Sequence, residues 1–202
     1  MSESLTAKLR RQSLIEATIT SIHVRGSLDV SVSEIARRAG VSSSLAHHYF
    51  GGKDQLVVAT MRHLLRQLHA TARAETAKET TPRGKVSALI RASFSPSQFD
   101  DVTVSAWLVF YARAQEAAEP ARLLRIYIRR LHSNLVYWLR PLTAERAQFV
   151  ANGVGAMIDG LYLRCALGHG VSEEQHAVDM TEDYVDAQIW QATASSRPSR
   201  LN

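Results

Sequence analysis

Residues 32–50 read VSEIARRAGVSSSLAHHYF, and no other stretch of the chain is as informative about its fold. It contains two short helical patterns, one carrying Ile35 and Ala36 and the other following Ser42, which are separated by a turn at Gly40. Small alanines let two helices cross closely, and glycine permits a turn conformation that most residues resist. The hydroxyl of Ser42 can cap the second helix by accepting a hydrogen bond from an unpaired backbone N–H. The stretch therefore predicts a helix-turn-helix.

The second helix of this pair is expected to present polar side chains to DNA. We assign its inward position to Leu45, which leaves short polar groups on the outer face. Such groups can meet base edges in the major groove, and residues just beyond the helix can hold phosphates that fix its register. The predicted base contacts are Ser43, Ser44, His47 and His48, the predicted phosphate contacts are Tyr49 and Lys53, and Ser31, Arg38 and Ser42 complete the DNA-binding set.

Amphipathic helices are predicted over nearly all of the remaining chain. Apolar residues recur at three- and four-residue spacing, and the alternation typical of strands is absent. The predicted fold class is all-α, with an N-terminal three-helix helix-turn-helix domain at 1–52, a C-terminal helical bundle for ligand binding and dimerisation at 53–193, and a disordered tail at 194–202. Outside the helix-turn-helix, helices are expected at about 6–24, 53–78, 84–94, 98–118, 121–140, 144–168 and 173–192.

The charge balance favours an anionic partner. Lys and Arg number 24 against 19 Asp and Glu, which gives a formal charge of +5 over 202 residues. A positive excess promotes association with polyanions such as DNA. The single cysteine, Cys165, excludes an intrachain disulfide, and no apolar run approaches the roughly 20 residues that span a bilayer. We expect a cytoplasmic protein with no membrane partner.

The sequence carries no pattern typical of an enzyme. It has no Gly-x-Ser-x-Gly nucleophile elbow, no phosphate-binding loop and no His-Glu-x-x-His pair. His47 and His48 are adjacent and point about 100° apart on a helix, so they cannot bind one metal ion as an i,i+4 pair would. We therefore expect no catalytic residues, no metal and no cofactor.

Two aromatic segments in the second half are candidates for an effector site. Trp107 and Tyr111 lie four residues apart, and Asp159 and Tyr162 lie three apart, so each pair is expected on one helix face. Aromatic ring faces together with a carboxylate can hold a quaternary ammonium ion through cation–π attraction and charge. The alternative is that these rings are ordinary core residues and that Asp159 pairs with a basic residue such as Arg164.

The helix-turn-helix resembles that of the TetR family of repressors. The resemblance implies a three-helix DNA-binding head followed by a helical body that binds a small-molecule effector and forms a homodimer on operator DNA. A tyrosine commonly stands at the position of His47, and Ala46 is smaller than the usual aliphatic residue, so these departures bear on the operator sequence. The matching positions are Ser31, Ile35, Ala36, Ala39, Gly40, Val41, Ser42, Tyr49, Phe50, Lys53 and Leu56.

Further segments resemble the branch of that family that represses glycine-betaine synthesis in response to choline. They include Ala106–Leu108, Ser133–Val136 and Ile158–Arg164. This resemblance implies choline or a related quaternary ammonium as the effector. A regulator that senses another cationic or hydrophobic small molecule, and a DNA-binding protein without an effector, are the alternatives. The implied ligand-binding set is Trp107, Tyr111, Asn134, Asp159 and Tyr162, with the two tyrosines at positions where tryptophan is expected.

A homodimer is expected because one short recognition helix reads too few bases. Two heads about 34–36 Å apart would reach successive major grooves of a pseudo-palindromic operator. The helices at 144–168 and 173–192 are expected to pair with their two-fold mates as a four-helix interface. The apolar residues assigned to that interface are Val150, Val154, Leu161, Val178, Val185 and Ile189.

Overall fold

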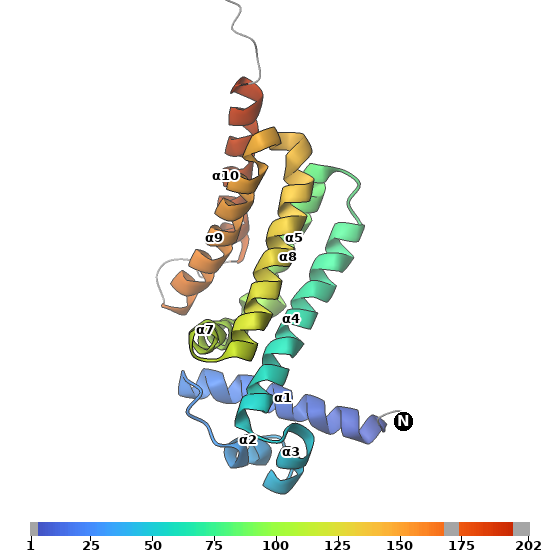
Figure 1. Cartoon of the computed structure of the whole chain (residues 1–202), viewed down its shortest axis with the longest axis vertical. Helices are drawn as coiled ribbons and strands as arrows, with labels where there is room; N and C mark the ends of the chain where they lie inside the picture. Colours follow the sequence, from blue (N-terminus) through green and yellow to red (C-terminus); the bar gives the residue numbers. More distant parts are fainter. Residues whose placement is uncertain (1–3, 168–173, 196–202) are drawn as a thin grey trace, which may run out of the picture. The chain divides into compact units, whose positions relative to one another are not determined.

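The structure, a computed structural model, describes residues 4–167 and 174–195. The described part is helical and contains no strand (Figure 1), which confirms the predicted all-α fold. The helices are α1 (Leu5–Arg25), α2 (Val32–Arg38), α3 (Ser43–Phe50), α4 (Lys53–Ala77), α5 (Pro82–Ser93), α6 (Pro96–Phe99), α7 (Asp101–Glu116), α8 (Ala118–Thr143), α9 (Ala147–Ala166) and α10 (Glu174–Ser195), with a short 3-10 helix at Ala144–Arg146.

The chain divides into two compact units. The first unit comprises residues 1–67 and 100–124, and the second comprises 68–99 and 125–202. Of the three divisions along the chain, two fall inside α4 and α8, and the third falls between α6 and α7. The domain boundary predicted after residue 52 was drawn between a DNA-binding part and an effector-binding part. It does not coincide with the division into compact units, and it stays a prediction. Of the tail predicted from residue 194, the first two residues belong to α10 and the others lie outside the described part.

In the first unit, α1 packs against α2 and α7, and α2 packs against α3. Gly26 ends α1 in the left-handed conformation, with φ 66°. The carboxylate of Asp100 accepts hydrogen bonds at 3.0 Å from the backbone N–H groups of Val102 and Thr103. This cap starts α7, so the single helix predicted over 98–118 is wrong: the structure has α6 and α7 instead.

Pro120 and Pro141 fall between the helices predicted from the sequence, but both lie inside α8. Pro120 occupies the first turn, where a backbone N–H would have no partner within the helix. Pro141 lies two residues before the last residue of the helix, so the hydrogen bond that it removes is among the last. Because neither position interrupts the middle of the ladder, α8 extends beyond the predicted 121–140 at both ends.

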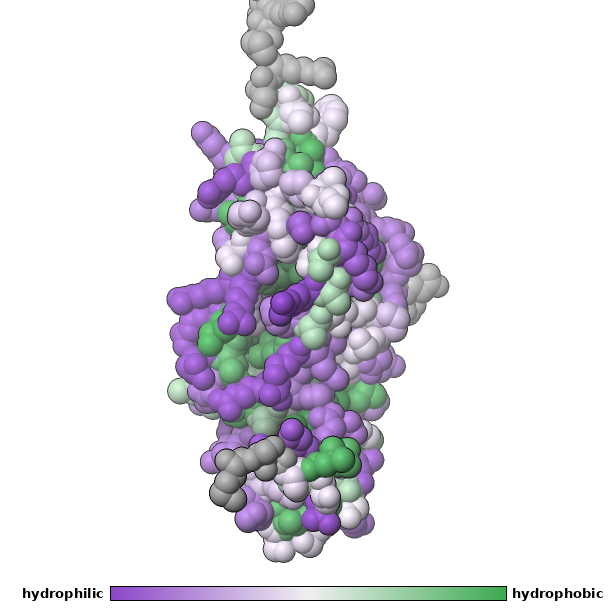
Figure 2. Space-filling model, turned by 90° about the vertical axis from the view of Figure 1, so that its right-hand side faces the viewer, coloured by the Kyte–Doolittle hydropathy of each residue, from purple (hydrophilic) through white to green (hydrophobic). Residues whose placement is uncertain are grey.

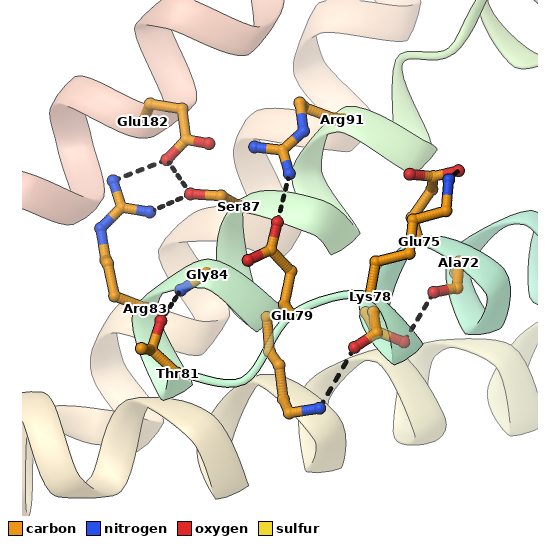
Figure 3. Close-up of polar contacts among 12 residues, drawn as sticks. Ala72, Glu75, Lys78, Glu79, Thr81, Arg83, Gly84, Ser87, Arg91 and Glu182 are labelled. Carbon is orange, nitrogen blue, oxygen red and sulfur yellow. Dashed lines mark hydrogen bonds and ion pairs between the residues drawn. The ribbon is translucent and has the colours of Figure 1, made fainter.

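In the second unit, α10 packs against both α9 and α5. The guanidinium of Arg83 on α5 contacts the carboxylates of Glu182, at 2.6 Å, and Asp186, at 2.8 Å, on α10. The hydroxyl of Ser87 also donates to Glu182 at 3.0 Å, and Figure 3 shows Arg83, Ser87 and Glu182 facing one another. Thr81 caps the start of α5 through the N–H of Gly84 (Figure 3). These contacts join α5 to the last helix of the unit.

The apolar residues assigned to a dimer interface lie mostly in the core of the second unit. Val150, Val154, Leu161 and Val185 are buried without any partner chain, so that assignment is wrong. The apolar spacing identified a real buried face on each helix. These faces of α9 and α10 pack within their own unit, where α10 contacts α9 and α5. Val178 and Ile189 are half-buried. Large apolar residues are exposed on α9, at the residue that follows it, and on α10: Phe149, Leu163, Leu167, Met180 and Trp190.

The surface drawn in Figure 2 is mostly hydrophilic, with apolar residues in separate patches. Among the described helices, none combines the length and the apolar character that crossing a bilayer requires.

Gly153 is expected to be required for the contact between α9 and α10. A Cβ atom built on Gly153 would overlap the hydroxyl of Tyr184 and lie 2.5 Å from its Cζ. Gly153→Ala should therefore lower the free energy of unfolding by about 1–3 kcal/mol, the usual cost of overpacking. Urea unfolding followed by circular dichroism measures this change.

Gly155→Ala and Gly160→Ala serve as matched controls, because a Cβ atom at either position meets nothing within 4 Å. Alanine forms helix more readily than glycine by about 1 kcal/mol, so both controls should be neutral or stabilising. A Gly153→Ala variant as stable as these controls would contradict the close packing against Tyr184.

Candidate nucleic-acid interface and effector site

The crossing of α2 and α3 fixes the recognition helix. Ala36 on α2 and Ala46 on α3 are both fully buried. Between the helices Gly40 adopts φ 68°, in the left-handed region, and the N–H of Val41 donates to the carbonyl of Ala36 at 3.0 Å. The inward face of α3 is formed by Ala46 and Phe50, whereas Leu45, to which we assigned it, is only half-buried. The prediction for Leu45 is therefore wrong by one position.

The outer face of α3 carries the predicted base contacts. Ser44, His47 and His48 are exposed, and Ser43 is half-buried. The His48 ring meets the Tyr49 ring edge-on at 5.6 Å, while His47 Nδ1 lies 3.5 Å from the carbonyl oxygen of the helix cap. These side chains lie outside the core of the head, where their polar atoms are accessible to a ligand.

Ser31 and Ser42 are helix caps. The Ser42 hydroxyl accepts from the N–H of Leu45 at 3.2 Å. The Ser31 hydroxyl accepts from the N–H of Glu34 at 3.1 Å, and the Glu34 carboxylate accepts from the N–H of Ser31 at 2.9 Å, which completes a capping box. The Ser-x-x-Glu spacing is the usual sequence signal for such a box, although we did not predict the box from it. If these two serines contacted DNA, each would do so with a hydroxyl that already accepts a hydrogen bond from the start of a helix.

The remaining predicted DNA contacts lie on α3 and on the helices directly before and after it in the chain. Arg38 is exposed at the end of α2, and Lys53 is half-buried at the first position of α4. Tyr49 packs against the head core, and its carbonyl accepts a hydrogen bond at 2.9 Å from Arg11 of α1. The Arg11 guanidinium also lies 4.6 Å from the centre of the Phe50 ring. Arg11 was missed, because a partner 38 residues away leaves no local pattern.

Ion pairs that the sequence did not predict hold the start of α4. Arg113 on α7 contacts Asp54 in the first turn of α4 at 2.8 Å. Arg62, two turns further, contacts Glu119 at the start of α8 at 2.5 Å, and Arg122 contacts the same carboxylate at 2.8 Å. Hydrogen bonds from Arg122 and Arg62 lower the pKa of Glu119 to about 2. The helix that follows α3 is thus tied to α7 and α8 within the first unit.

These ion pairs border a pocket of about 390 Å³ in the first unit. Its wall combines charged groups that pair with one another and small apolar side chains. None of the five residues predicted to bind the effector lines it. The lining residues are Asp54, Gln55, Val57, Val58, Arg62, Arg113, Ala117, Glu119 and Pro120.

The aromatic pair predicted on α7 is present in the first unit. Trp107 is buried and Tyr111 half-buried, and their ring centres are 6.2 Å apart with planes inclined by 33°. The Trp107 ring also meets Phe110 edge-on at 6.4 Å. The spacing of four residues therefore brings the two rings together, and their role toward an effector stays a prediction.

In the second unit, the acid and the aromatic predicted on α9 differ in exposure. Tyr162 is buried, its hydroxyl donates to the carbonyl of Ser93, and its ring centre lies 5.5 Å from that of Phe99. Asp159 is exposed. Burial, and to a lesser extent the negative charge of Asp159, raise the pKa of Tyr127 on α8. Three residues turn a helix by about 300°, which leaves the two side chains about 60° apart around its axis. Tyr162 lies on the buried side of α9 and Asp159 on its exposed side, and their joint role toward an effector stays a prediction.

Asn134, the fifth predicted ligand residue, is exposed on α8. Within the described residues, no three His, Cys, Asp or Glu side chains lie close enough together to hold a metal ion. The roles of the five ligand residues, like those of the nine DNA contacts, stay predictions.

Two family profiles match the chain. Residues 14–60 match the profile described as bacterial regulatory proteins, tetR family, and residues 82–189 match the profile described as BetI-type transcriptional repressor, C-terminal. The chain is 54% identical over 182 residues to the HTH-type transcriptional regulator BetI of Brucella anthropi, a match that covers 90% of this chain and 94% of that protein.

Solved structures share the fold. A putative transcriptional regulator from Pseudomonas aeruginosa PAO1 is 28% identical, with a TM-score of 0.74 over 94% of this chain and 95% of that one. A putative transcriptional regulator from Saccharomonospora viridis, solved in complex with choline, is 20% identical, with a TM-score of 0.79 over 87% of this chain and 95% of that one. At 20% identity, the second likeness concerns the fold alone.

The capping box of α2 predicts a pH dependence of stability. Hydrogen bonds from the Ser31 backbone, from Arg25 and from the Ser31 hydroxyl lower the pKa of Glu34 from 4.5 to about 2. A carboxylate with a lowered pKa stabilises the fold above its unfolded pKa, and this contribution is lost as the pH falls through the folded value. The contribution of Glu34 should therefore disappear between about pH 4.5 and about pH 2.

Glu34→Gln provides the comparison, because glutamine can occupy a capping box but does not titrate. Thermal unfolding measured from neutral pH to about pH 2 should show the wild type more stable at neutral pH and the difference narrowing in acid. A difference that stays constant over this range would show that the Glu34 charge does not stabilise α2.

Proposed function

Because the chain belongs to the TetR family of transcriptional regulators and is a BetI-type repressor, we propose that it binds a pseudo-palindromic operator as a homodimer under the control of choline or a related quaternary ammonium. The proteins that it matches are regulators, and the chain is a regulator rather than an enzyme. The proposed targets are genes of choline uptake and glycine-betaine synthesis. The exposed outer face of α3 carries the proposal.

Operator recognition follows from how α3 is mounted. Ala46 and Phe50 anchor one side of the helix in the head core, which leaves His47 and His48 on the other side. Imidazole rings both donate and accept hydrogen bonds, so they can pair with base edges in the major groove. Lys53, three residues after the end of α3 and at the first position of α4, supplies a positive charge that can bind a phosphate. The outer face of α3 is therefore proposed to read bases, and its flanks to hold phosphates.

Dimerisation is proposed through the outer faces of α9 and α10. Phe149 on α9 is 60% exposed and Trp190 on α10 is 73% exposed, and both side chains would remain in water in a single chain. Arg146, whose guanidinium lies 5.1 Å from the Phe149 ring centre, also donates to Gln188 on α10. The two exposed rings thus belong to helices that pack together. Their burial against a second copy would remove apolar surface from water.

Control by an effector is proposed to act through α4. This helix begins directly after the recognition helix and continues for 25 residues, past the point where the first unit ends. A ligand that binds the DNA-free form about a hundredfold more tightly lowers operator affinity by about 2.7 kcal/mol, because coupling between sites is reciprocal. The ligand then needs no contact with DNA.

Choline is the proposed effector for two reasons. The chain shares its fold with a regulator solved in complex with choline, and its C-terminal region matches the BetI-type profile. The Trp107 and Tyr111 rings supply aromatic faces, and Asp159 supplies an exposed carboxylate. A different cationic or hydrophobic effector is the second candidate, since both tyrosines of the set offer weaker ring faces than tryptophan.

Loss of a base-reading side chain is expected to weaken operator binding. His47→Ala should lower the affinity by about tenfold or more, since a good contact to a base contributes about 1–3 kcal/mol. Tyr49→Phe, which keeps the packing of the ring, tests the phenolic hydroxyl separately. Fluorescence anisotropy with an operator selected by the wild type from random DNA measures both.

His69→Ala is the matched control, because His69 is exposed on α4 outside the proposed interface. A duplex with a single half-site should bind far more weakly than the full operator. An unchanged operator affinity of the His47→Ala variant would reject the proposed interface. An equal affinity of the wild type for the single half-site and for the full operator would reject the dimer.

Choline is expected to bind the wild type and to lower its operator affinity. Asp159→Asn should reduce choline affinity by about tenfold or more, because an amide of the same shape lacks the charge that attracts a quaternary ammonium. Trp107→Phe keeps most of the packing at this buried position and should weaken binding because phenylalanine has a weaker ring face. Isothermal titration calorimetry measures both variants.

Asp29→Asn removes the same charge from an exposed loop of the head and should leave choline binding unchanged. If the wild type did not bind choline but bound another cation, the proposed effector would be that cation and not choline. Tighter operator binding in the presence of choline would contradict the proposed direction of control.

A further inference from the structure

The first two turns of α1 form no part of the head core. Helix α1 starts at Leu5, where the Ser4 hydroxyl accepts from the N–H of Ala7 at 3.2 Å. Its first buried side chain is Leu14, and none of the residues from Leu5 to Arg10 is buried. The Leu5 and Leu9 side chains are 73% and 60% exposed. Folding of the head therefore does not account for this part of the helix.

This segment is positively charged. Lys8 and Arg10 are exposed, Arg11 follows, and the next acidic residue along the chain is Glu16. Among residues 4–167 and 174–195, no carboxylate forms an ion pair with Lys8 or Arg10. Two neighbouring cations that no carboxylate of the described residues neutralises favour an anionic partner.

Arg11 joins the segment to the recognition helix. Its guanidinium donates to the Tyr49 carbonyl at 2.9 Å and lies 4.6 Å from the Phe50 ring centre, at the last two residues of α3. Lys8 lies one turn before Arg11, about 5 Å along the helix axis, and Arg10 is its neighbour. In Figure 1, α1 continues past α3 toward its N-terminal end. The helical turn that carries Lys8 and Arg10 is therefore attached through Arg11 to the C-terminal end of the helix proposed to read bases.

We propose that the first two turns of α1 bind the phosphate backbone of the DNA that flanks each operator half-site. Lys8 and Arg10 make the phosphate contacts, and Arg11 holds the segment against α3. The inference rests on the proposed function, since it extends the interface of the same head. Phosphate contacts position a protein on duplex DNA without reading sequence, and flexible cationic side chains on a rigid helix suit that role.

Salt dependence tests the proposal directly. Each phosphate contact contributes about 0.9 to the slope of log K against log salt for duplex DNA. Lys8→Gln/Arg10→Gln removes four contacts from a dimer and should reduce the slope by about 3.6. The measurement uses the full chain and the operator selected by the wild type, between about 50 and 200 mM salt.

The length of the duplex provides a second readout. One duplex ends at the half-sites, and another carries about six further base pairs on each side, roughly 20 Å of helix. The wild type should bind the longer duplex more tightly, and the double variant should bind the two duplexes equally. Arg66→Gln/Arg73→Gln, which removes two exposed cations from α4, is the matched control and should retain the wild-type gain from the flanks.

Equal thermal unfolding midpoints for the double variant and the wild type verify that the exposed substitutions leave the fold intact. The inference would be overturned if the Lys8→Gln/Arg10→Gln variant kept the salt dependence of the wild type and its gain in affinity for the longer duplex. The proposed function would then still stand. A wild type that selects no operator would overturn the proposed function, and the inference with it.

Discussion

The close crossing of α2 and α3 is the constraint on which the proposed DNA-binding face depends. Ala36 and Ala46 are fully buried at this crossing, and a larger side chain at either position would push α3 outward and turn its exposed face. Gly40 completes the constraint, because its φ of 68° sets the direction of the chain between the two helices. The outer side chains of α3 owe their orientation to three residues that would not touch DNA.

The next constraint acts on α4. Gly51 ends α3 with φ 77°, and the first turns of α4 are then tied by Asp54 to Arg113 and by Arg62 to Glu119. These ion pairs lie near the surface, where solvent screens them and each contributes little to stability. Their value is geometric, since they fix the direction of α4 against α7 and α8. Weak pairs also exchange partners at little cost, which is compatible with the proposed action of an effector through α4.

The sequence predicted those parts of the structure that local patterns determine. The Gly40 turn and the all-helical fold follow from a glycine position and from apolar spacing. The Ser31–Glu34 capping box also has a local signal, its Ser-x-x-Glu spacing, although we did not predict it. Contacts between distant segments left no such signal. The Arg11–Tyr49 hydrogen bond and the Arg113–Asp54 ion pair depend on which helices meet, and this is a property of the folded chain.

The misassigned faces have the same physical origin. Apolar spacing shows that a helix has a buried face, but it does not show whether that face meets its own chain or a partner. Val150 and Val154 were therefore assigned to a dimer and lie in a core, and Leu45 was placed inward where Ala46 is the buried residue. A small residue leaves a weak apolar signal although it permits the closest approach, so the position that decides a helix crossing is the hardest to recognise.

Charge is distributed unevenly along the chain. Between residues 4 and 53 the chain carries seven Lys and Arg residues against three acidic ones, whereas α10 carries five acidic residues and no Lys or Arg. The total of +5 thus combines +4 from residues 4–53 and −5 from α10 with +6 from the rest of the chain. Because the field near a surface depends on local charge and salt screens distant charges within about 10 Å, a polyanion approaching the head meets a stronger attraction than the total implies. Arg83 pairs with two of the five carboxylates of α10, and the other three leave this helix a less favourable surface for a polyanion than residues 4–53.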